Sequence, residues 1–407
     1  LPAWFDVNAQ RRQSLGFCDV GAPSEAVTDL PVTVILTPDI FDFATAQPDG
    51  SDVFFVDGSD EQPLPFQKAQ FQPTGTAPFA VFFVRVPSFN PHTQTDALWM
   101  YWDQIAPVSR EDIAATWSGH LAVWHMDSVP VNADGSSLQI ASASSVVDTV
   151  SGAIALNAFA SAANNNQGAF VFGALGLLGH SALFDAGGVG CGAGCQADSF
   201  MVLPVPAGLT SDVGSISVVA GSITDSNGDG SQTRSGFGGG GCANGSADCG
   251  HLWLLGERAG STGFDAKSLH VTTFEAGRVG VSRPSNPSTA GNFSATSDTA
   301  VISQDAFSVV SATWSASSID VTVTVADGAT VDQTVITSAR AGVSIPISNF
   351  ALAVSENTSR FDQAGDLFGS LEEIRVSGVT RSPAFVRAEA AAHLGELFVF
   401  GAEETVP

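Results

Sequence analysis

The segment from Asp225 to Gly230 carries the clearest metal-binding pattern in the sequence. Asp225, Asn227 and Asp229 alternate with small residues, and Gly230 follows, as at the start of a D-x-N-x-D-G calcium loop. Three hard oxygen donors at alternating positions can converge on one Ca²⁺ ion, and the glycine allows the sharp turn. Gly236 stands where the twelfth-position Glu would be, so the segment is not an EF-hand. Calcium binding and a plain Asn-Gly and Asp-Gly turn are therefore the two interpretations.

The five cysteines bear on the redox compartment. Four lie in two glycine-rich segments, as Cys191 with Cys195 and Cys242 with Cys249, and Cys18 is left over. Local 191–195 and 242–249 disulfides are the simplest pairing, two crossed pairings are the alternatives, and disulfides indicate an oxidising compartment. Four thiolates on zinc are a further alternative, although the spacings are not of the usual C-x2-C type. We expect Cys18 to be a buried thiol or an intermolecular link.

Carboxylates and histidines that could support hydrolysis are poorly arranged for it. A glycosidase needs two carboxylates about 5–10 Å apart across one cleft. Glu372 and Glu373 are neighbours on a predicted strand, so their side chains point to opposite faces of the sheet. His120 and His125 are an odd number of residues apart, so they too would face opposite sides and could not share a metal ion. The sequence contains no G-x-S-x-G, S-x-x-K or H-E-x-x-H motif. We expect a non-enzymatic protein, with a glycoside-active enzyme disfavoured.

Aromatic side chains could form a glycan site if they were exposed. By type alone the candidates are Trp253, Trp314 and Phe237, which lies in a glycine-rich loop. Aromatic residues of β-sandwiches are mostly buried in the core, and we expect this of two of the three. Phe237 is the one that we expect to be exposed.

The charge balance excludes some partners. The chain has 41 acidic residues against 15 Lys and Arg, a net charge of −26, and charged residues make up only 14% of it. Such a surface repels nucleic acid and anionic lipid headgroups, and it suits a salty medium that screens the self-repulsion. A mean hydropathy of +0.20 with so few charges also favours packing between subunits.

Nothing in the sequence predicts a transmembrane helix. The uncharged stretch 152–184 is interrupted by Asn164, Asn165, Asn166 and Gln167 and by recurring glycines, so buried strands are expected there. The sequence begins at Leu1 rather than Met, as a mature chain does after removal of a signal peptide. We therefore expect a secreted or cell-surface protein, extracellular or periplasmic.

Periodicity predicts an all-β protein with two short helices. Residues 319–325 alternate apolar and polar side chains, which is typical of a half-buried strand. Further strands are expected at 32–37, 52–57, 80–87, 97–102, 121–126, 200–203, 215–224, 269–274, 307–314, 350–354 and 371–377. A capping box from Ser109 to Asp112 predicts a helix at 110–117, and Ser382-Pro383 predicts a second helix that stops at Gly395.

The first predicted helix marks a domain boundary. We expect a small antiparallel β-sandwich over residues 1–117 and a larger, concanavalin-like jelly roll over 118–407, with the helices as connectors. The segment 225–250, rich in glycine, has the composition of an inserted surface loop.

Several short motifs occur in the order typical of one family. They are Trp4 with Arg11-Arg12, Leu30-Pro31-Val32, Phe41-Asp42-Phe43, Asp49-Gly50-Ser51-Asp52-Val53, Leu64-Pro65-Phe66, Phe83-Val84-Arg85-Val86-Pro87 and Trp99-Met100-Tyr101-Trp102. In this ordered set the N-terminal part resembles the DUF2341 family, an extracytoplasmic β domain of unassigned function. The chain departs from the family at Gln67, where Glu is frequent, and at Trp102-Asp103, where Gly-Asn is usual.

The remainder resembles a laminin-G-like, concanavalin-type jelly roll. The motifs are Ala122-Val123-Trp124-His125-Met126, Leu183-Phe184-Asp185, the closing-strand run from Phe368 to Ser377 with Arg381-Ser382, and the run from Phe398 to Glu404. The resemblance implies the fold, whereas this sandwich serves lectins, adhesins, protease-linked modules and some glycosidases.

Two functions fit these observations better than an enzyme. The first is a structural or adhesive surface protein that self-associates into a filament, sheath or oligomer. Its interface candidates are the apolar terminal residues Trp4, Phe5, Phe398 and Phe400, together with Cys18. These terminal segments either pack on their own sandwich or cover a neighbour, for instance by strand addition.

The alternative is a glycan- or protein-binding module that depends on calcium, with its ligand held by loops at the rim of the sandwich. The long segment 225–250 is its main support. A periplasmic accessory of an ExbB-type system is an expectation by analogy, because DUF2341 domains accompany such components.

Overall fold

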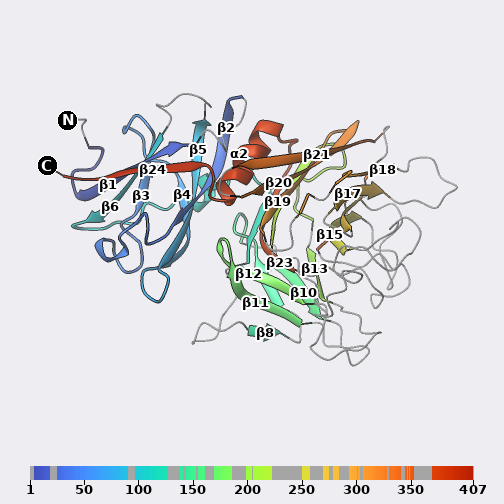
Figure 1. Ribbon diagram of the computed structural model, residues 1–407, viewed down its shortest axis with the longest axis horizontal. Helices are drawn as coiled ribbons and strands as arrows, with labels where there is room; N and C mark the ends of the chain where they lie inside the picture. The colour runs from blue at the N-terminus through green and yellow to red at the C-terminus, as the bar shows by residue number, and fades with distance from the viewer. Residues whose placement is uncertain are drawn as a thin grey trace. The chain divides into compact units, whose positions relative to one another are not determined.

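The computed structural model describes residues 4–18, 25–89, 97–126, 138–140, 144–152, 155–160, 169–185, 199–203, 205–221, 250–256, 269–274, 278–283, 293–299, 301–302, 306–327, 330–340, 344–345, 347, 349–352 and 369–406. Strands dominate these residues, and the pairings described between them are antiparallel. The predicted all-β class is confirmed (Figure 1). None of the described helices is long and apolar enough to cross a membrane.

The chain forms two compact units. The first contains Leu1–Gly119, Ala326–Asp332 and Ser382–Pro407, and the second contains His120–Val325 and Gln333–Arg381. Each unit has two sheets that share one hydrophobic core, which is the arrangement of a β-sandwich.

The first unit is built from a four-stranded and a three-stranded sheet. The four-stranded sheet has the order β24 (Phe398–Thr405), β1 (Ala9–Phe17), β6 (Ala97–Gln104), β3 (Phe54–Val56). The three-stranded sheet has the order β2 (Val27–Leu36), β5 (Phe79–Phe89), β4 (Phe66–Gln72). The helices of this unit are η1 (Phe43–Thr45), α1 (Ile113–Thr116) and α2 (Pro383–His393).

Aromatic side chains join the two sheets of the first unit. Phe55 of β3 lies with its ring centroid 5.4 Å from that of Phe66 in β4 and 5.4 Å from that of Phe82 in β5. Offset and edge-on aromatic pairs of this kind add to the free energy gained by burying their area. Pro31 is accommodated because β2 is an edge strand of its sheet, where the missing N–H leaves no ladder bond unmade.

The second unit is built from larger sheets. The nine-stranded sheet has the order β21 (Val331–Ala339), β20 (Ser318–Ala326), β19 (Ser308–Trp314), β14 (Gly214–Gly221), β23 (Gly369–Ser377), β12 (Gly179–Asp185), β11 (Ala169–Gly176), β8 (Leu138–Ile140), and β7 (Ala122–His125) pairs with β23. The eight-stranded sheet has the order β18 (Phe293–Thr296), β17 (Arg278–Arg283), β16 (Leu269–Phe274), β15 (Gly250–Gly256), β22 (Asn349–Leu352), β13 (Ser199–Leu203), β10 (Ala155–Ala160), β9 (Ser144–Val147). Buried Trp124 of β7 faces Phe350 of β22 across the core, 6.4 Å between ring centroids.

The C-terminal segment differs from the expected domain limits. The sequence places residues 118–407 in one domain, whereas Ser382–Pro407 belongs to the first unit. The physical reason is strand pairing, because β24 pairs antiparallel with β1 (Figure 1). In this pairing Arg12 is opposite Glu404 and Phe17 is opposite Phe398. The apolar side of α2 adds Phe385 to the core of the same unit.

The two predicted helices have different outcomes. The second is confirmed: the Ser382 hydroxyl accepts a hydrogen bond from the Phe385 N–H, and Gly395 follows the helix with a φ of 78°. The first is shorter than predicted. Its cap is Asp112, whose carboxylate accepts a hydrogen bond from the Ala115 N–H at 2.9 Å, so Ser109 does not cap it.

Candidate functional site

The four-stranded sheet has one face turned to the core and one turned outward. Side chains alternate along a strand, so Leu15 and Phe17 of β1 face the core, while Arg12, Ser14 and Gly16 are on the opposite, outer face.

The partners across the outer face follow from the register. Tyr101 of β6 and Glu404 of β24 are opposite Arg12, Trp99 is opposite Ser14, and Val399 is opposite Gly16. Phe54 of β3 is opposite Tyr101 and so lies on the same face. The outer face therefore combines the Arg12 guanidinium, the rings of Tyr101, Trp99 and Phe54, and the small residues Ser14 and Gly16.

Arg12 is the centre of this face and is only 1% exposed. Its Nε donates to Glu404 at 2.8 Å, and its Nη2 lies 2.7 Å from the same carboxylate. Its Nη1 donates to Asp60 at 2.7 Å and to the Tyr101 hydroxyl oxygen at 3.2 Å. The planar fork of an arginine suits two such partners at once, which lysine could not provide.

Two tryptophan rings lie against the Arg12 guanidinium. Its Cζ lies 4.7 Å from the ring centroid of Trp4 and 4.3 Å from that of Trp99. The electron-rich faces of the indoles attract the cation, most strongly where water is excluded. Trp4 also makes an edge-on contact with Tyr101, 5.6 Å between centroids. The N-terminal segment is thereby fixed on the sheet.

The turn that follows β3 completes the cluster. Asp60 has a φ of 62°, a left-handed conformation uncommon for a residue with a side chain. Its carboxylate accepts the Tyr101 hydroxyl at 2.6 Å, while the Tyr101 oxygen accepts the Phe5 N–H at 3.1 Å. Loss of water contact, followed by the hydrogen bond to Asp60, raises the pKa of Tyr101 to about 12. Desolvation also raises the pKa of Asp60, against the opposing effects of Tyr101 and Arg12.

Beyond this cluster the outer face stays partly open. We call the set Ser14, Gly16, Trp99 and Val399 the Trp99 surface. Ser14, Gly16 and Trp99 are half-buried, and Val399 is 58% exposed. A side chain at Gly16 would meet only the Val399 carbonyl oxygen, 3.7 Å from its Cβ, so the position has room. Ser14 and Gly16 are small residues and so form a low floor beside the indole that Arg12 contacts.

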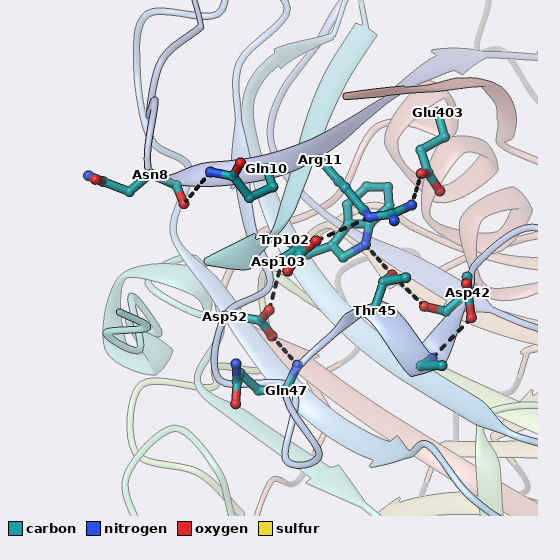
Figure 2. A network of polar contacts seen from close by, with 11 residues as sticks. Asn8, Gln10, Arg11, Asp42, Thr45, Gln47, Asp52, Trp102, Asp103 and Glu403 are labelled. Atoms are coloured by element: carbon teal, nitrogen blue, oxygen red, sulfur yellow. Dashed lines mark hydrogen bonds and ion pairs between the residues drawn. The ribbon is translucent and has the colours of Figure 1, made fainter. Parts of the chain in front are cut away.

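A second polar network lies at the edge of the same sheet (Figure 2). Arg11 pairs with Asp103 at 3.2 Å and with Glu403. Buried Asp52 accepts the Gln47 N–H at 2.9 Å and the Asp103 N–H at 2.8 Å. Asp103 has a φ of 60°, a left-handed conformation that is uncommon for a residue with a side chain. These contacts fix loops to the sheet, so the carboxylates of Asp52, Asp103 and Glu403 have structural roles.

Glu372 and Glu373 of the second unit have separate partners, consistent with the expected opposite directions. The two oxygens of Glu372 accept the N–H groups of Leu177 and Leu178, at 2.6 and 2.8 Å, in the turn between β11 and β12. Burial is the main cause that raises the pKa of Glu372 to about 7, with Glu373 adding to it, although the two N–H bonds oppose the shift.

Glu373 takes part in a buried polar group. Its carboxylate is 2.7 Å from Nδ1 of His125 and accepts a hydrogen bond from Nε of Arg375. Each of the three residues is at most 5% exposed. His125 is opposite Glu373 in the β7–β23 register, so the pair is a cross-strand contact. His120 is buried ahead of β7. The described residues contain no group of three or more His, Cys, Asp or Glu that could hold a metal ion.

The proposed interface residues pack on their own unit. Trp4, Phe5, Phe398 and Phe400 are partly buried against its core, and Phe398 lies 5.4 Å from Phe17 between ring centroids. The terminal segments therefore pack on their own sandwich, which is one of the two expectations for them. Within the described part of the chain Cys18 is a free, half-buried thiol, and its N–H donates to the Leu397 carbonyl at 2.7 Å.

The structure describes only some of the other residues that the sequence singled out. Trp314 is buried and donates its indole N–H to the Thr210 carbonyl at 3.1 Å, so it belongs to the core. Trp253 lies in β15, but its side chain is outside the described residues. The same holds for Phe237, for the calcium candidates Asp225, Asn227 and Asp229, and for Cys191, Cys195, Cys242 and Cys249.

Sequence reasoning missed the Arg12 cluster as a site. Its members Trp4, Arg12, Trp99 and Tyr101 do occur in the ordered motifs that carry the DUF2341 resemblance. The order of these motifs is the sequence signal that could have drawn attention to the cluster. Their convergence depends on pairing with Glu404, which is 392 residues from Arg12 in the sequence.

Comparisons with known proteins support the fold class and nothing more specific. No protein-family model matches the chain, and no curated protein matches it, so the resemblance to the DUF2341 and laminin-G-like families has no such support.

Several solved structures have a distant likeness to this chain. The CBM40 of a Ruminococcus gnavus IT-sialidase bound to α2,3-sialyllactose is 12% identical, with 44% of this chain and 83% of that chain covered and a TM-score of 0.30. An arabinofuranosidase complexed with arabinofuranosyl-α-1,2-xylobiose is 10% identical over 64% and 52%, with a TM-score of 0.36. A Trypanosoma rangeli sialidase in complex with DANA is 13% identical over 79% and 41%, with a TM-score of 0.34. These values carry no argument about ligand or reaction.

Proposed function

We propose that the protein is a non-enzymatic, extracellular glycan-binding β-sandwich protein that holds its ligand on the Trp99 surface. The observation that carries the proposal is the partly exposed Trp99 indole, held against Arg12 beside a low floor formed by Ser14 and Gly16.

The chemistry of the Trp99 surface suits a sugar ring. One side of a pyranose is largely C–H and can lie on an indole, while its edge carries hydroxyl groups that need polar partners. Trp99 offers the apolar ring, and Ser14, opposite it on β1, offers a hydroxyl that lies beside Gly401 of β24. Binding sites commonly combine aromatic area with a few polar groups in this way.

The rigidity of the surface also favours binding. The Trp99 ring contacts a guanidinium that two carboxylates hold from opposite ends. A ring that is already immobile loses little further freedom when a ligand lies on it, so less of the interaction free energy is lost to ordering.

The proposal includes two further features, the absence of catalysis and an extracellular location. The absence of catalysis rests on Glu372 and Glu373, whose contacts with Leu177, Leu178, His125 and Arg375 give these acids structural roles. The extracellular location rests on the cysteine spacing and the acidic composition of the sequence. Self-association is not part of the proposal, because the terminal aromatic residues pack on their own unit.

A substitution at Gly16 tests the proposed function. Gly16→Val places a side chain on the floor beside Trp99, and valine suits a strand, so the fold is expected to persist. In a glycan-binding assay with the full chain we expect this variant to bind at least about tenfold more weakly, a loss of about 1.4 kcal/mol.

The matched control is Ser88→Val, which adds a similar side chain at an exposed position of β5 in the other sheet of the unit. It should bind as the unmodified protein does. Equal affinities of the Gly16→Val variant and the unmodified protein would show that the ligand lies elsewhere.

A further inference from the structure

We infer that the Trp99 surface takes neutral glycans and discriminates against glycans that carry carboxylate or sulfate groups. The inference rests on the proposed function and adds the class of ligand.

The first argument is that Arg12, the cation in contact with Trp99, is already paired within the protein, as is Arg110 of the same face, which pairs with Asp6. Recognition of an acidic sugar needs a donor such as a guanidinium with N–H groups free to form a bidentate contact. Each of the three nitrogens of Arg12 instead has a partner within the protein: Nε and Nη2 have Glu404, and Nη1 has Asp60 and Tyr101. The rings of Trp4 and Trp99 also lie against the guanidinium, with their centroids 4.7 and 4.3 Å from its Cζ atom.

The second argument is the local charge. Two carboxylates, of Asp60 and Glu404, surround the single guanidinium of Arg12, and the Glu404 side chain is 46% exposed. An anionic ligand on Trp99 would therefore approach a site of net negative charge on a chain of net charge −26. A neutral sugar meets no such repulsion and still gains the contact with the indole.

Glu404 thus acts as a selectivity element. It pairs with Arg12, and its side chain is the more exposed of the two carboxylates, 46% against 8% for Asp60. Glu404→Gln should release part of the guanidinium and so strengthen binding of acidic glycans. Glu403→Gln is the matched control, because it makes the same charge change one residue away, on a side chain that pairs with Arg11 instead.

The test is a glycan array that holds neutral, sialylated, uronate-containing and sulfated glycans, probed with the full chain. The four proteins are the unmodified chain and its Gly16→Val, Glu404→Gln and Glu403→Gln variants. We expect the unmodified chain to bind neutral glycans in preference, Gly16→Val to lose that binding, and only Glu404→Gln to gain acidic ligands.

The outcomes separate the two proposals. If the unmodified chain prefers acidic glycans and Gly16→Val abolishes the binding, the Trp99 surface stands and the neutral selectivity is wrong. If no glycan binds, or if Gly16→Val leaves binding intact, the proposed function is wrong and the selectivity is overturned with it.

Discussion

Arg12 and Trp99 lie on neighbouring strands, and the Arg12 Cζ atom is 4.3 Å from the centroid of the Trp99 ring. Arg12 has two carboxylate partners, so the contact joins an aromatic side chain of β6 to a turn and to the C-terminal strand. The guanidinium is therefore expected to control both the stability of the unit and the position of the indole.

Removal of the Arg12 charge should destabilise the first unit strongly. Arg12→Met leaves Asp60, whose side chain is 8% exposed, without its cationic partner, so we expect a loss of about 3 kcal/mol in the free energy of unfolding. Urea unfolding followed by circular dichroism measures the change. The control is Arg11→Met, whose side chain is 28% exposed and should cost less than about 1 kcal/mol. Equal costs for both variants would show that the buried cluster adds no special stability.

The hydroxyl of Tyr101 should titrate near pH 12. It is the only tyrosine in the chain, so the absorbance of phenolate reports this group alone. Its pKa is raised from 10.0 to about 12, so the native state holds the proton more tightly than the unfolded state, and stability should fall as the pH rises from about 10 to 12. Asp60→Asn should lower the midpoint, because it removes an acceptor carboxylate. A midpoint near 10 in the unmodified protein would contradict the buried geometry.

The acid Glu372 should make the second unit less stable as the pH rises. Its pKa is raised from 4.5 to about 7, so its contribution to stability is greatest below about pH 4.5 and declines up to about pH 7, by roughly 3 kcal/mol. Glu372→Gln keeps an acceptor for the turn and should remove this decline. Hydrogen exchange at Leu177 and Leu178 measures the effect locally. Asp212→Asn, at an exposed position, should leave the pH profile unchanged.

Gly50 should not tolerate a side chain. It has a φ of 66°, and a Cβ there would lie 2.5 Å from a ring carbon of Phe71. Gly50→Ala therefore combines backbone strain with overlap, and we expect a loss of about 3 kcal/mol. Gly75→Ala is the control, because Gly75 also has a positive φ, of 118°, but nothing lies within 4 Å of its Cβ. Similar losses in the two variants would mean that strain alone, without overlap, sets the cost at Gly50.

Calcium binding by Asp225, Asn227 and Asp229 stays a prediction from the sequence, and melting curves test it. A cation that binds only the folded state should raise the melting temperature as its concentration increases. The calcium interpretation predicts that Ca²⁺ does so in the unmodified protein and not in a variant with Asp225→Asn and Asp229→Asn together. Identical melting with calcium and with a chelator would favour the plain turn.

The periodic strands of the fold could be predicted from the sequence. The alternation in residues 319–325 corresponds to β20 (Ser318–Ala326), and the apolar run 80–87 corresponds to β5 (Phe79–Phe89). By contrast β1 was not predicted, because Arg11 and Arg12 interrupt its apolar pattern. The buried Arg12 is stable there only because its charge is matched by Asp60 and Glu404, which local sequence cannot reveal.

The candidate site was less predictable than the fold. Trp99 and Tyr101 belong to a recognisable motif, but their relation to Ser14, Gly16 and Val399 depends on a register between distant strands. The shift of register between Gln13 and Leu15 in the pairing with β24 makes this harder still, because one extra residue changes which side chains share a face.

The pairing of β1 with β24 has a consequence for how the chain is made. Domains usually fold in order as they leave the ribosome. The first unit cannot do so, because its edge strand and α2 come from residues 382–407, after the whole second unit has been synthesised. Its partly formed sheet must stay unpaired along β1 while the larger unit emerges, so a nascent chain stalled before Phe398 should expose that edge to chaperones.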